Sequence, residues 1–341
     1  MKSIRFENDR LYLLDQTRLP LQETWLEFTE YRKIVAAIKA RVVTGGSAVG
    51  IVGSYTYLLA ALACSALPND LFAGSMVRVK KEIMSACPNS RSLKAALENM
   101  ERVLAVHDWK PRACEALRTA ALELHFADAE KNREISLNGL AAVPKSACIL
   151  TAASTGDLST GGFGTALGIV RAAYKAGRVK MVFICETRPD FDGSRIAAYE
   201  LQQDNIPVTV HTDSSAAVLM SSNLIDLVVL SSDHVASDGD ALCAPGSYAL
   251  AILARYHGVP LYVTALDYAI DLSSESGADL RIDQMSAESL VEVGSERVYS
   301  DGVKLFNPSG DIVPHGLMTG IITKKGIVYP PYSENLVNIL I

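Results

Sequence analysis

Two features of this sequence carry residue types that could do chemistry. Asp233 and His234 follow the apolar run Leu227–Ser232, and a carboxyl that is partly buried there could carry a proton, because burial raises its pKa. The glycine-rich loop from Ser154 to Gly164 precedes a helical pattern, so its backbone N–H groups would suit an anion such as phosphate. Each feature also has a plainer interpretation: an Asp that caps a helix or turn, and glycines that only permit a tight turn. His234 need not cooperate with Asp233, because neighbours on a strand point to opposite faces.

The elements that must position these residues alternate regularly after about residue 145. Short β-rich runs predict strands at Ala147–Leu150, Met181–Cys185, Val208–Thr212, Leu227–Ser231 and Leu261–Thr264. Helical patterns lie between them at Thr165–Ala176, Ser194–Asp204, Ser214–Asn223 and Gly246–His257. This alternation is typical of a parallel sheet covered on both faces, so the fold class is α/β with a Rossmann-like C-terminal domain.

Polar groups follow several of these predicted strands. The residues just after the strands are Thr151–Gly164, Glu186-Thr187-Arg188, Asp213, Asp233-His234 and Ala265, and all of these segments except Ala265 carry polar side chains. Ligands of such sheets bind beyond the carboxyl ends of the strands, so these loops are the expected site. The loop is only loosely related to the G-x-G-x-x-G pattern, and no acidic residue follows the second strand where a dinucleotide would need one, so no nicotinamide cofactor is expected.

The first 140 residues have a different, mainly helical character. Ile4-Arg5-Phe6 and Leu11–Leu14 flank a turn and predict a short hairpin. Apolar residues at helical spacing between Tyr31 and Val42 predict a helix, and further helices are expected at Ser92–Val106 and Pro111–Ile135. We therefore expect a smaller helical domain at residues 1–140 and a Rossmann-like domain at residues 141–341.

Composition limits the function classes. The chain of 341 residues has 32 basic and 38 acidic side chains, and a net charge of −6 with no basic run argues against nucleic-acid binding. Hydrophobic residues make up 49% and charged residues 21%, which excludes a disordered chain. The six cysteines form no C-x-x-C pair, so neither a metal site nor a dithiol motif is indicated.

One uncharged stretch, Thr44–Pro68, is long enough to cross a membrane. Its glycine, serine and threonine content favours a buried helix instead, one that a single protomer would have difficulty covering. That difficulty suggests a homodimer. The N-terminus lacks the apolar region of a secretion signal, so a cytoplasmic location is expected.

Nine short segments, spread over essentially the whole chain, carry a more specific signal. They are Leu14-Asp15-Gln16 with Leu19-Pro20, Ile149-Leu150-Thr151, Gly164-Thr165-Ala166-Leu167-Gly168, Glu186-Thr187-Arg188-Pro189, Ile206-Pro207-Val208-Thr209, Gly239-Asp240, Gly246-Ser247-Tyr248, Asn307-Pro308 and Ile321-Ile322-Thr323. In order and spacing they resemble the methylthioribose-1-phosphate isomerase family. The same superfamily includes ribose-1,5-bisphosphate isomerases and regulatory subunits of translation initiation factor 2B. The Glu-Thr-Arg-Pro and Gly-Thr-Ala-Leu-Gly segments favour the isomerases, which form homodimers.

The resemblance implies where the site lies and how it departs from the family. Isomerases of this family use a cysteine in the first strand-to-helix loop and an aspartate after a later strand for aldose–ketose conversion. The aspartate falls at Asp233, whereas the cysteine position is Ala153, which cannot carry a proton. The expected substrate-binding residues are Thr44, Gly45, Gly46, Arg91, Ser154, Thr155, Gly156, Asp192, Asp240, Cys243 and Ala244.

Several of these positions differ from the family pattern. An arginine is replaced by Thr44, a glutamine by Asp192, and an Asn-Lys pair by Cys243-Ala244, followed by Pro245. A further family arginine falls at Ser90 or Arg91. Two cations are lost and one carboxylate is gained around the expected phosphate.

Three hypotheses remain open. The first is an isomerase-type enzyme with an altered substrate, which acts on a small-molecule sugar or sugar-phosphate ligand and needs no cofactor or metal. The second is a non-catalytic paralogue that binds a metabolite or a protein partner. The third is a methylthioribose-1-phosphate isomerase with a rearranged site, in which Ser154 or Cys243 takes over from the missing thiol.

Overall fold

The computed structural model describes residues 3–107, 110–293 and 296–340, and the chain divides into two compact units. The N-terminal unit comprises Met1–Arg133 and Thr155–Gly168, and the C-terminal unit comprises Glu134–Ser154 and Ile169–Ile341. The expected boundary at 140/141 differs from this division in two ways. The division falls inside a long helix, and the glycine-rich loop groups with the N-terminal unit although it follows a strand of the other unit.

The N-terminal unit combines a small sheet with helices. The expected hairpin is confirmed as β1 (Ile4–Glu7) and β2 (Arg10–Leu14), and β3 (Trp25–Phe28), which the sequence did not predict, extends the antiparallel sheet. The helices are α1 (Tyr31–Lys39), α2 (Ala48–Cys64), α3 (Asn69–Met84), α4 (Arg91–Ala105) and α5 (Lys110–Gly139). The helix predicted up to Val42 ends earlier, and Arg41 beyond it has a left-handed backbone, with φ 59°.

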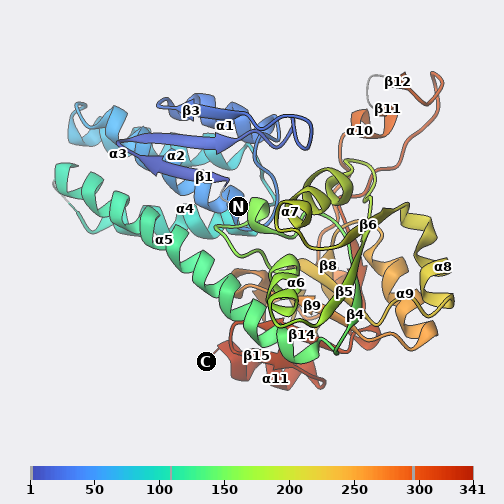
Figure 1. Ribbon diagram of the computed structural model, residues 1–341. Coiled ribbons are helices and arrows are strands. Elements are labelled where there is room, and N and C mark those ends of the chain that lie inside the picture. Colours follow the sequence, from blue (N-terminus) through green and yellow to red (C-terminus); the bar gives the residue numbers. More distant parts are fainter. Residues whose placement is uncertain (1–2, 108–109, 294–295, 341) are drawn as a thin grey trace. The chain divides into compact units, whose positions relative to one another are not determined.

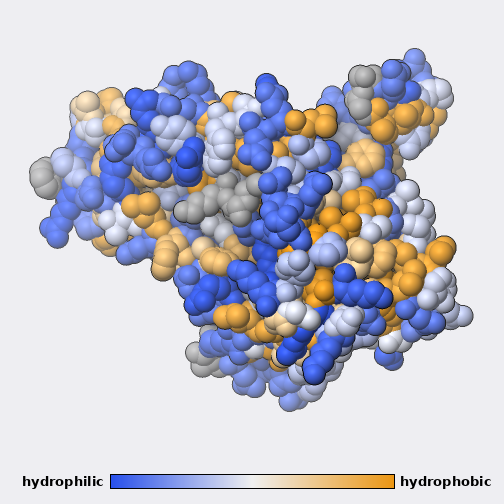
Figure 2. All heavy atoms as spheres, in the orientation of Figure 1, coloured by the Kyte–Doolittle hydropathy of each residue, from blue (hydrophilic) through white to orange (hydrophobic). Residues whose placement is uncertain are grey.

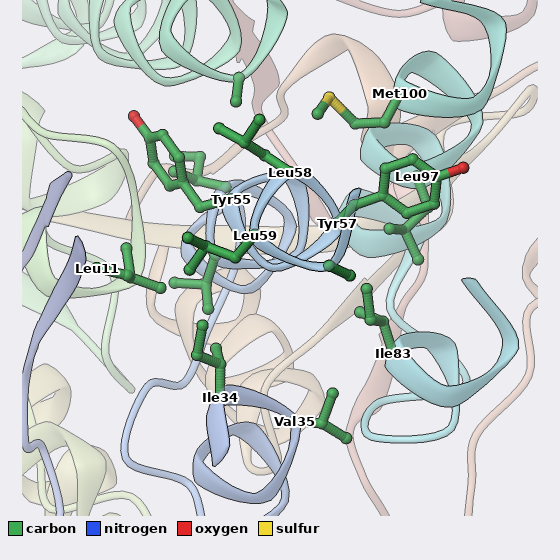
Figure 3. Packing of buried hydrophobic residues seen from close by; sticks show 14 of the residues in the cluster. Leu11, Ile34, Val35, Tyr55, Tyr57, Leu58, Leu59, Ile83, Leu97 and Met100 are labelled. Atoms are coloured by element: carbon green, nitrogen blue, oxygen red, sulfur yellow. The ribbon is translucent and has the colours of Figure 1, made fainter. Parts of the chain in front are cut away.

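Helix α2 is the centre of the N-terminal core. Every residue from Ala48 to Ala61 is buried, and α1, α3 and α4 pack around it. Figure 3 shows Tyr55, Leu58 and Leu59 of this helix among side chains of the neighbouring elements. The uncharged stretch is therefore covered by its own unit. The sequence argument that it needs a second protomer was wrong, because α3 and α4 supply the missing apolar surface.

The C-terminal unit is built on the predicted parallel sheet (Figure 1). The parallel strands, in spatial order, are β14 (Gly320–Thr323), β9 (Leu261–Thr264), β7 (Leu227–Ala236), β4 (Ala147–Thr151), β5 (Val179–Cys185) and β6 (Val208–His211). An antiparallel edge strand, β15 (Gly326–Val328), follows β14. Smaller strands are β8 (Ala241–Cys243), β10 (Ile270–Asp271), β13 (Asp311–Val313) and the β11–β12 pair (Glu292–Val293 and Glu296–Arg297). The Rossmann-like α/β fold class is confirmed.

Helices cover this sheet on its two faces. They are α6 (Ala166–Lys175), α7 (Ala198–Gln203), α8 (Ala216–Ser221), α9 (Ser247–His257) and α11 (Tyr332–Leu340), whereas the short helix α10 (Glu288–Val291) lies beside β11. A π-helical turn at Gly193–Ala197 precedes α7, and 3₁₀ turns lie at Leu140–Ala142, Asp157–Ser159, Asp213–Ser215, Asp267–Ala269, Gly277–Asp279 and His315–Leu317. Figure 1 shows α8 and α9 on the opposite side of the sheet from α6. In the described residues no helix is both long and apolar enough to span a membrane.

Candidate functional site

The strand order defines where a ligand of this sheet would bind. In chain order the parallel strands follow the pattern 3-2-1-4-5-6, so the direction of winding reverses between β4 and β7. Ligands of such sheets bind beyond the strand ends at this reversal. The segments that leave β4 and β7 there carry Ala153 and Asp233, the two positions that the sequence singled out.

Asp233 lies on a β-bulge. Strand β7 runs five residues further than predicted because its end pairs with β8, and the ladder shifts register between Ser232 and His234. Asp233 is the extra residue, so its side chain is freed from the regular alternation of the strand. The side chain is exposed to solvent, yet desolvation by the surrounding protein raises its pKa. A carboxyl that water can reach, and whose pKa is raised above that of an ordinary aspartate, is suited to proton transfer.

His234 has a separate partner. Its Nε2 lies 3.1 Å from Oδ2 of Asp271, and both side chains are largely buried. Asp271 also accepts hydrogen bonds from Ser273 through its backbone N–H and its Oγ. The contact with the Asp271 carboxylate therefore connects the His234 side chain to β10.

Ala153 keeps an unusual backbone conformation. Its φ is 61°, in the left-handed region that costs residues other than glycine about 1–2 kcal/mol. Its N–H donates to Thr187 Oγ1 at 2.8 Å, and that hydroxyl donates to the carbonyl of Cys185 at 3.0 Å. The backbone at this position is therefore held firmly, although the methyl side chain supplies no group that could exchange a proton.

We expect the substitution Ala153→Gly to raise the free energy of unfolding by about 0.5–1 kcal/mol, because glycine adopts positive φ without steric cost. The control is Ala152→Gly, at a buried neighbour whose φ is not positive, which should destabilise instead. Urea unfolding curves of both variants check this. A loss of stability in Ala153→Gly would contradict it.

The Glu186–Pro189 segment is anchored by Asp213. The carboxylate of Asp213 accepts from the backbone N–H groups of Thr187 at 2.9 Å and Arg188 at 2.8 Å. Gly193 packs so closely here that a Cβ would lie 1.9 Å from the carbonyl oxygen of Cys185 and 2.8 Å from Thr187 Oγ1. Asp192, which directly precedes this glycine and is half-buried, is thus placed beside the residue that holds Ala153.

Cys243 lies across the ladder from β7. It pairs with Ser232 and is buried, and its pKa is raised well above its usual range by desolvation and by the charges of Asp233 and Asp311. Its thiol is therefore protonated at neutral pH and is no thiolate nucleophile. Ser154, after β4, has a buried hydroxyl that finds no partner in the part of the chain that the structure describes.

Asp240 is bound within the protein. Its Oδ1 accepts from the backbone N–H of His315 and lies 2.8 Å from His315 Nδ1, and its Oδ2 accepts from Gly277 N–H at 3.0 Å. With Asp238, these side chains bring three potential metal-ligating atoms within 4.8 Å of one another. Because Asp240 and His315 already bond each other, the cluster links the β7–β8 turn to the chain near residue 315 without a metal.

The start of α9 already has an anionic partner. Ala244 lies two residues before Gly246, whose N–H donates to Asp311 Oδ2 at 2.9 Å, and Tyr248 N–H donates to the same oxygen at 3.1 Å. A helix N-terminus is a natural anion site. Here the protein's own carboxylate takes these two donors.

The remaining expected ligand residues lie in the N-terminal unit. Gly45 and Gly46 have positive φ values of 82° and 24°. The carbonyl of Gly46 accepts from Ser92 Oγ at 2.7 Å, which brings the start of α4 against this segment. Ser90 caps α4, since its Oγ accepts from Leu93 N–H, and half-buried Arg91 is the first helical residue. Both sequence candidates for the family arginine, Ser90 and Arg91, thus lie at the start of α4, next to the residue that bonds Gly46.

The glycine-rich loop closes on itself. The carbonyl of Thr155 accepts from Thr165 N–H at 3.1 Å and Leu167 N–H at 3.2 Å. A Cβ on Gly164 would lie 2.5 Å from the Cα of Gly156, and its φ is 52°, so only glycine fits. The plainer interpretation, a tight turn, accounts for Gly164, while the Thr155 hydroxyl is buried with no partner in the described ranges.

The structure groups the sequence-derived positions into separate sets. The N-terminal unit brings Thr44–Gly46, Arg91 and Thr155–Gly156 onto connected segments, and the C-terminal unit places Ala153 with Asp192 and Asp233 with Cys243. Sequence reasoning placed Thr187 and Asp213 directly after predicted strands but gave them no role in holding these positions. Gln16 stands in a segment that carries the resemblance, and nothing in the local pattern marks Asp128 or Asp311.

Comparisons with known proteins agree with this architecture. Residues 42–330 match the model of the initiation factor 2 subunit family. A curated methylthioribose-1-phosphate isomerase of Pelotomaculum thermopropionicum is 38% identical over 98% of this chain and 93% of its own length. The protein of the same name from Carboxydothermus hydrogenoformans is 38% identical and covers 98% of both chains.

Two solved structures have the same fold over nearly the whole chain. The 5-methylthioribose 1-phosphate isomerase of Pyrococcus horikoshii OT3 superposes with a TM-score of 0.93 and 29% identity, covering 99% of this chain and 95% of that chain. The translation initiation factor eIF-2B, subunit delta, from A. fulgidus superposes with a TM-score of 0.89 and 30% identity, covering 100% and 99%. Fold alone therefore does not separate the enzyme from the regulatory subunit.

Proposed function

Because this chain belongs to the initiation factor 2 subunit family, we propose that it is an aldose–ketose isomerase of the methylthioribose-1-phosphate isomerase type with an altered substrate. Asp233 is the observation that carries the proposal. Its carboxyl is exposed on a bulge at the strand reversal, and desolvation raises its pKa. A group that only capped a turn would need neither property.

The proposed chemistry needs one mobile proton. Aldose–ketose conversion moves a hydrogen from C2 to C1 of the sugar, with a matching proton shift between the two oxygens, and leaves the molecular formula unchanged. Asp233 carries a proton between these positions, and desolvation raises its pKa, which favours proton uptake relative to an ordinary aspartate. No metal or organic cofactor is needed for this transfer.

Charge supports an altered substrate. A phosphate dianion needs fixed cations or free N–H donors, and this chain has Thr44 and Ala244 where the family has Arg and Lys. Asp192 adds a negative charge beside Thr187, and Asp311 takes the two N–H donors at the start of α9. The ligand is therefore a sugar or sugar-derived molecule that offers hydroxyls or a cationic group.

The two other hypotheses have less support. Cys243 as a replacement nucleophile requires a thiolate, which its buried, acid-flanked position disfavours. A non-catalytic role as in regulatory subunits would not need a proton-carrying Asp233, and the curated relatives named above are isomerases.

The direct test is calorimetry and a coupled isomerase assay on methylthioribose 1-phosphate and on methylthioribose without phosphate. We expect weak binding and slow turnover of the phosphorylated sugar by the unmodified protein. Turnover of methylthioribose 1-phosphate at a rate usual for an isomerase would contradict the altered substrate. Absence of isomerisation of any pentose derivative, phosphorylated or not, would contradict the activity.

We also propose that the protein is a homodimer in the cytoplasm, as the sequence predicted. With α2 covered, the supporting surface is on α9, where the exposed Tyr248, Ile252 and Tyr256 recur at four-residue intervals beside Val218 of α8. Figure 2 shows hydrophobic residues gathered over this part of the C-terminal unit. Contiguous apolar surface of this kind is typical of subunit contacts.

Light scattering should return about twice the chain mass of 36.7 kDa at micromolar concentration. The substitution Ile252→Arg should shift this mass to the monomer, because a buried unpaired charge opposes association. Leu71→Arg, on an exposed position of α3, is the matched control and should stay dimeric. A monomeric unmodified protein would contradict the proposal.

A further inference from the structure

Two buried polar side chains join the two ligand-binding segments of the N-terminal unit. One segment is 44–47, between α1 and α2, and the other is 155–161 in the glycine-rich loop. More than 100 residues of chain separate them, and both carry positions that the resemblance assigns to the ligand. The bridging side chains, Gln16 and Asp128, carry no assigned role.

Gln16 spans the segments with the two ends of its amide. It is only 1% exposed, and its Oε1 accepts from Thr44 Oγ1 at 2.9 Å and from Thr44 N–H at 3.3 Å. Its Nε2 donates to the carbonyl of Leu158 at 2.7 Å. Its backbone N–H donates to Val42, which fixes the glutamine to the chain just before the first segment.

Asp128 forms the second bridge from helix α5. Its Oδ2 accepts from Ser47 Oγ at 2.7 Å, from Gly161 N–H at 2.7 Å and from Asn132 Nδ2 at 3.1 Å. Gly161 fits only without a side chain, since a Cβ would lie 2.9 Å from the carbonyl of His125 and 3.0 Å from Asp128 Oδ2. Asp128 Oδ2 therefore connects the loop backbone at Gly161 to helix α5, and it also bonds Ser47 at the start of α2.

These bridges do more than fill the core. A buried polar group lowers the stability of the fold unless its hydrogen bonds are made. Apolar packing could hold a loop in place without that requirement. Directed bonds instead fix the distance and orientation of the segments they join. Both bridges act on backbone or hydroxyl groups within a few residues of Thr44, Gly46 and Thr155.

We propose that Gln16 and Asp128 are positioning residues, which hold the segments 44–47 and 155–161 in a fixed relation so that both contact one ligand together. The proposal rests on the proposed function, because it takes these segments as parts of the ligand site. The two side chains act through Thr44, Ser47, Leu158 and Gly161 and do not touch the ligand themselves.

The test compares Asp128→Ala with Asp128→Asn in the full-length protein. Because all three donors meet one oxygen, an asparagine oxygen in that place can accept the same bonds, whereas alanine accepts none. Hydrogen exchange followed by mass spectrometry should show exchange at least about tenfold faster in both segments of Asp128→Ala. Asp128→Asn should stay within about threefold of the unmodified protein.

Gln16→Leu and Met76→Ala complete the set. Gln16→Leu keeps the side-chain volume but removes the hydrogen bonds of the amide to Thr44 and to Leu158, so it should also speed exchange in both segments. Met76→Ala makes a cavity in the buried face of α3, and it should lower the Tm without selective exchange in the two segments. This control separates positioning from a general loss of stability.

Ligand binding is the second readout, with methylthioribose 1-phosphate as the probe up to millimolar concentration. We expect the Kd to rise at least about tenfold in Asp128→Ala and Gln16→Leu, and to be restored in Asp128→Asn. Faster exchange with an unchanged Kd would overturn the proposal, as would faster exchange in only one segment. If the unmodified protein does not bind this probe, the altered substrate of the proposed function still stands, and methylthioribose without phosphate replaces it as the probe. The same changes in Kd are then expected, and an unchanged Kd in Asp128→Ala overturns the proposal.

Discussion

The substitution Asp233→Asn is expected to lower kcat by roughly 10²–10⁴-fold on whichever sugar the protein isomerises. The amide is nearly isosteric but cannot release or accept the proton that must move between C1 and C2. KM should change little, because Asp233 takes part in the transfer and not in holding an anionic group. A coupled isomerase assay measures both constants.

The matched control is Asp226→Asn, one residue before the start of β7. Asp226 Oδ2 accepts from Cys148 N–H at 2.8 Å, at the end of the strands opposite Asp233. An asparagine oxygen can accept the same bond, so activity should stay close to that of the unmodified protein. If Asp233→Asn retained full activity, the assignment of the proton carrier would fail.

The same variant should change stability in a pH-dependent way. The pKa of Asp233 is raised from 3.8 in the folded protein because desolvation disfavours the charged form. Between that value and the raised one, the folded protein binds more protons than the unfolded chain, so stability decreases as pH increases through this window. Asp233→Asn removes the charge, and we therefore expect a higher Tm than that of the unmodified protein at pH 7, with the difference vanishing below about pH 4. Thermal unfolding between pH 3.5 and 8 checks this. A lower Tm for the variant at pH 7 would contradict the conclusion that desolvation of the Asp233 carboxyl raises its pKa.

The second large effect concerns the ligand. Restoring the family residues together, as Thr44→Arg with Cys243→Asn and Ala244→Lys, is expected to tighten binding of methylthioribose 1-phosphate by roughly 10²–10⁴-fold. Each charged hydrogen bond to phosphate contributes about 1.5–3 kcal/mol, and this combination returns two cations. Ala153→Cys alone restores a thiol but no phosphate ligand, so it should not recover full activity.

Asp192 limits what the restored cations can achieve. Unit charges of like sign at 4 Å repel by about 4 kcal/mol at an effective dielectric constant of 20, so a phosphate bound that close to the Asp192 carboxylate would be destabilised. Adding Asp192→Gln should therefore tighten binding further. Calorimetry on the unmodified protein and on the restored protein with and without Asp192→Gln, with Ala153→Cys as the comparison, separates phosphate binding from catalysis. Equal affinity of the unmodified and restored proteins would show that these positions do not contact the phosphate.

Much of the fold could be predicted from local patterns. The hairpin, the helices at 92–106 and 111–135, and the strands of the parallel sheet lie close to their expected ranges, because each has the spacing of apolar residues that its type of element needs. Strand β14, the edge strand β15 and helix α3 were not predicted. The predicted strand ended at Ser231 because polar residues follow it. In the structure β7 extends further because its end pairs with β8.

The sequence by itself determined the chemistry that is available: a carboxyl at Asp233, an alanine at position 153, and a set of replaced cations. These are facts of residue type, which no folding can alter. Only the tertiary structure decided that Asp233 lies on a bulge with a raised pKa and that Asp311 takes the N–H donors of α9. It also decided that Gln16 and Asp128 join segments more than 100 residues apart. Burial and hydrogen bonding depend on which distant segments meet, and a local pattern records only the neighbours along the chain.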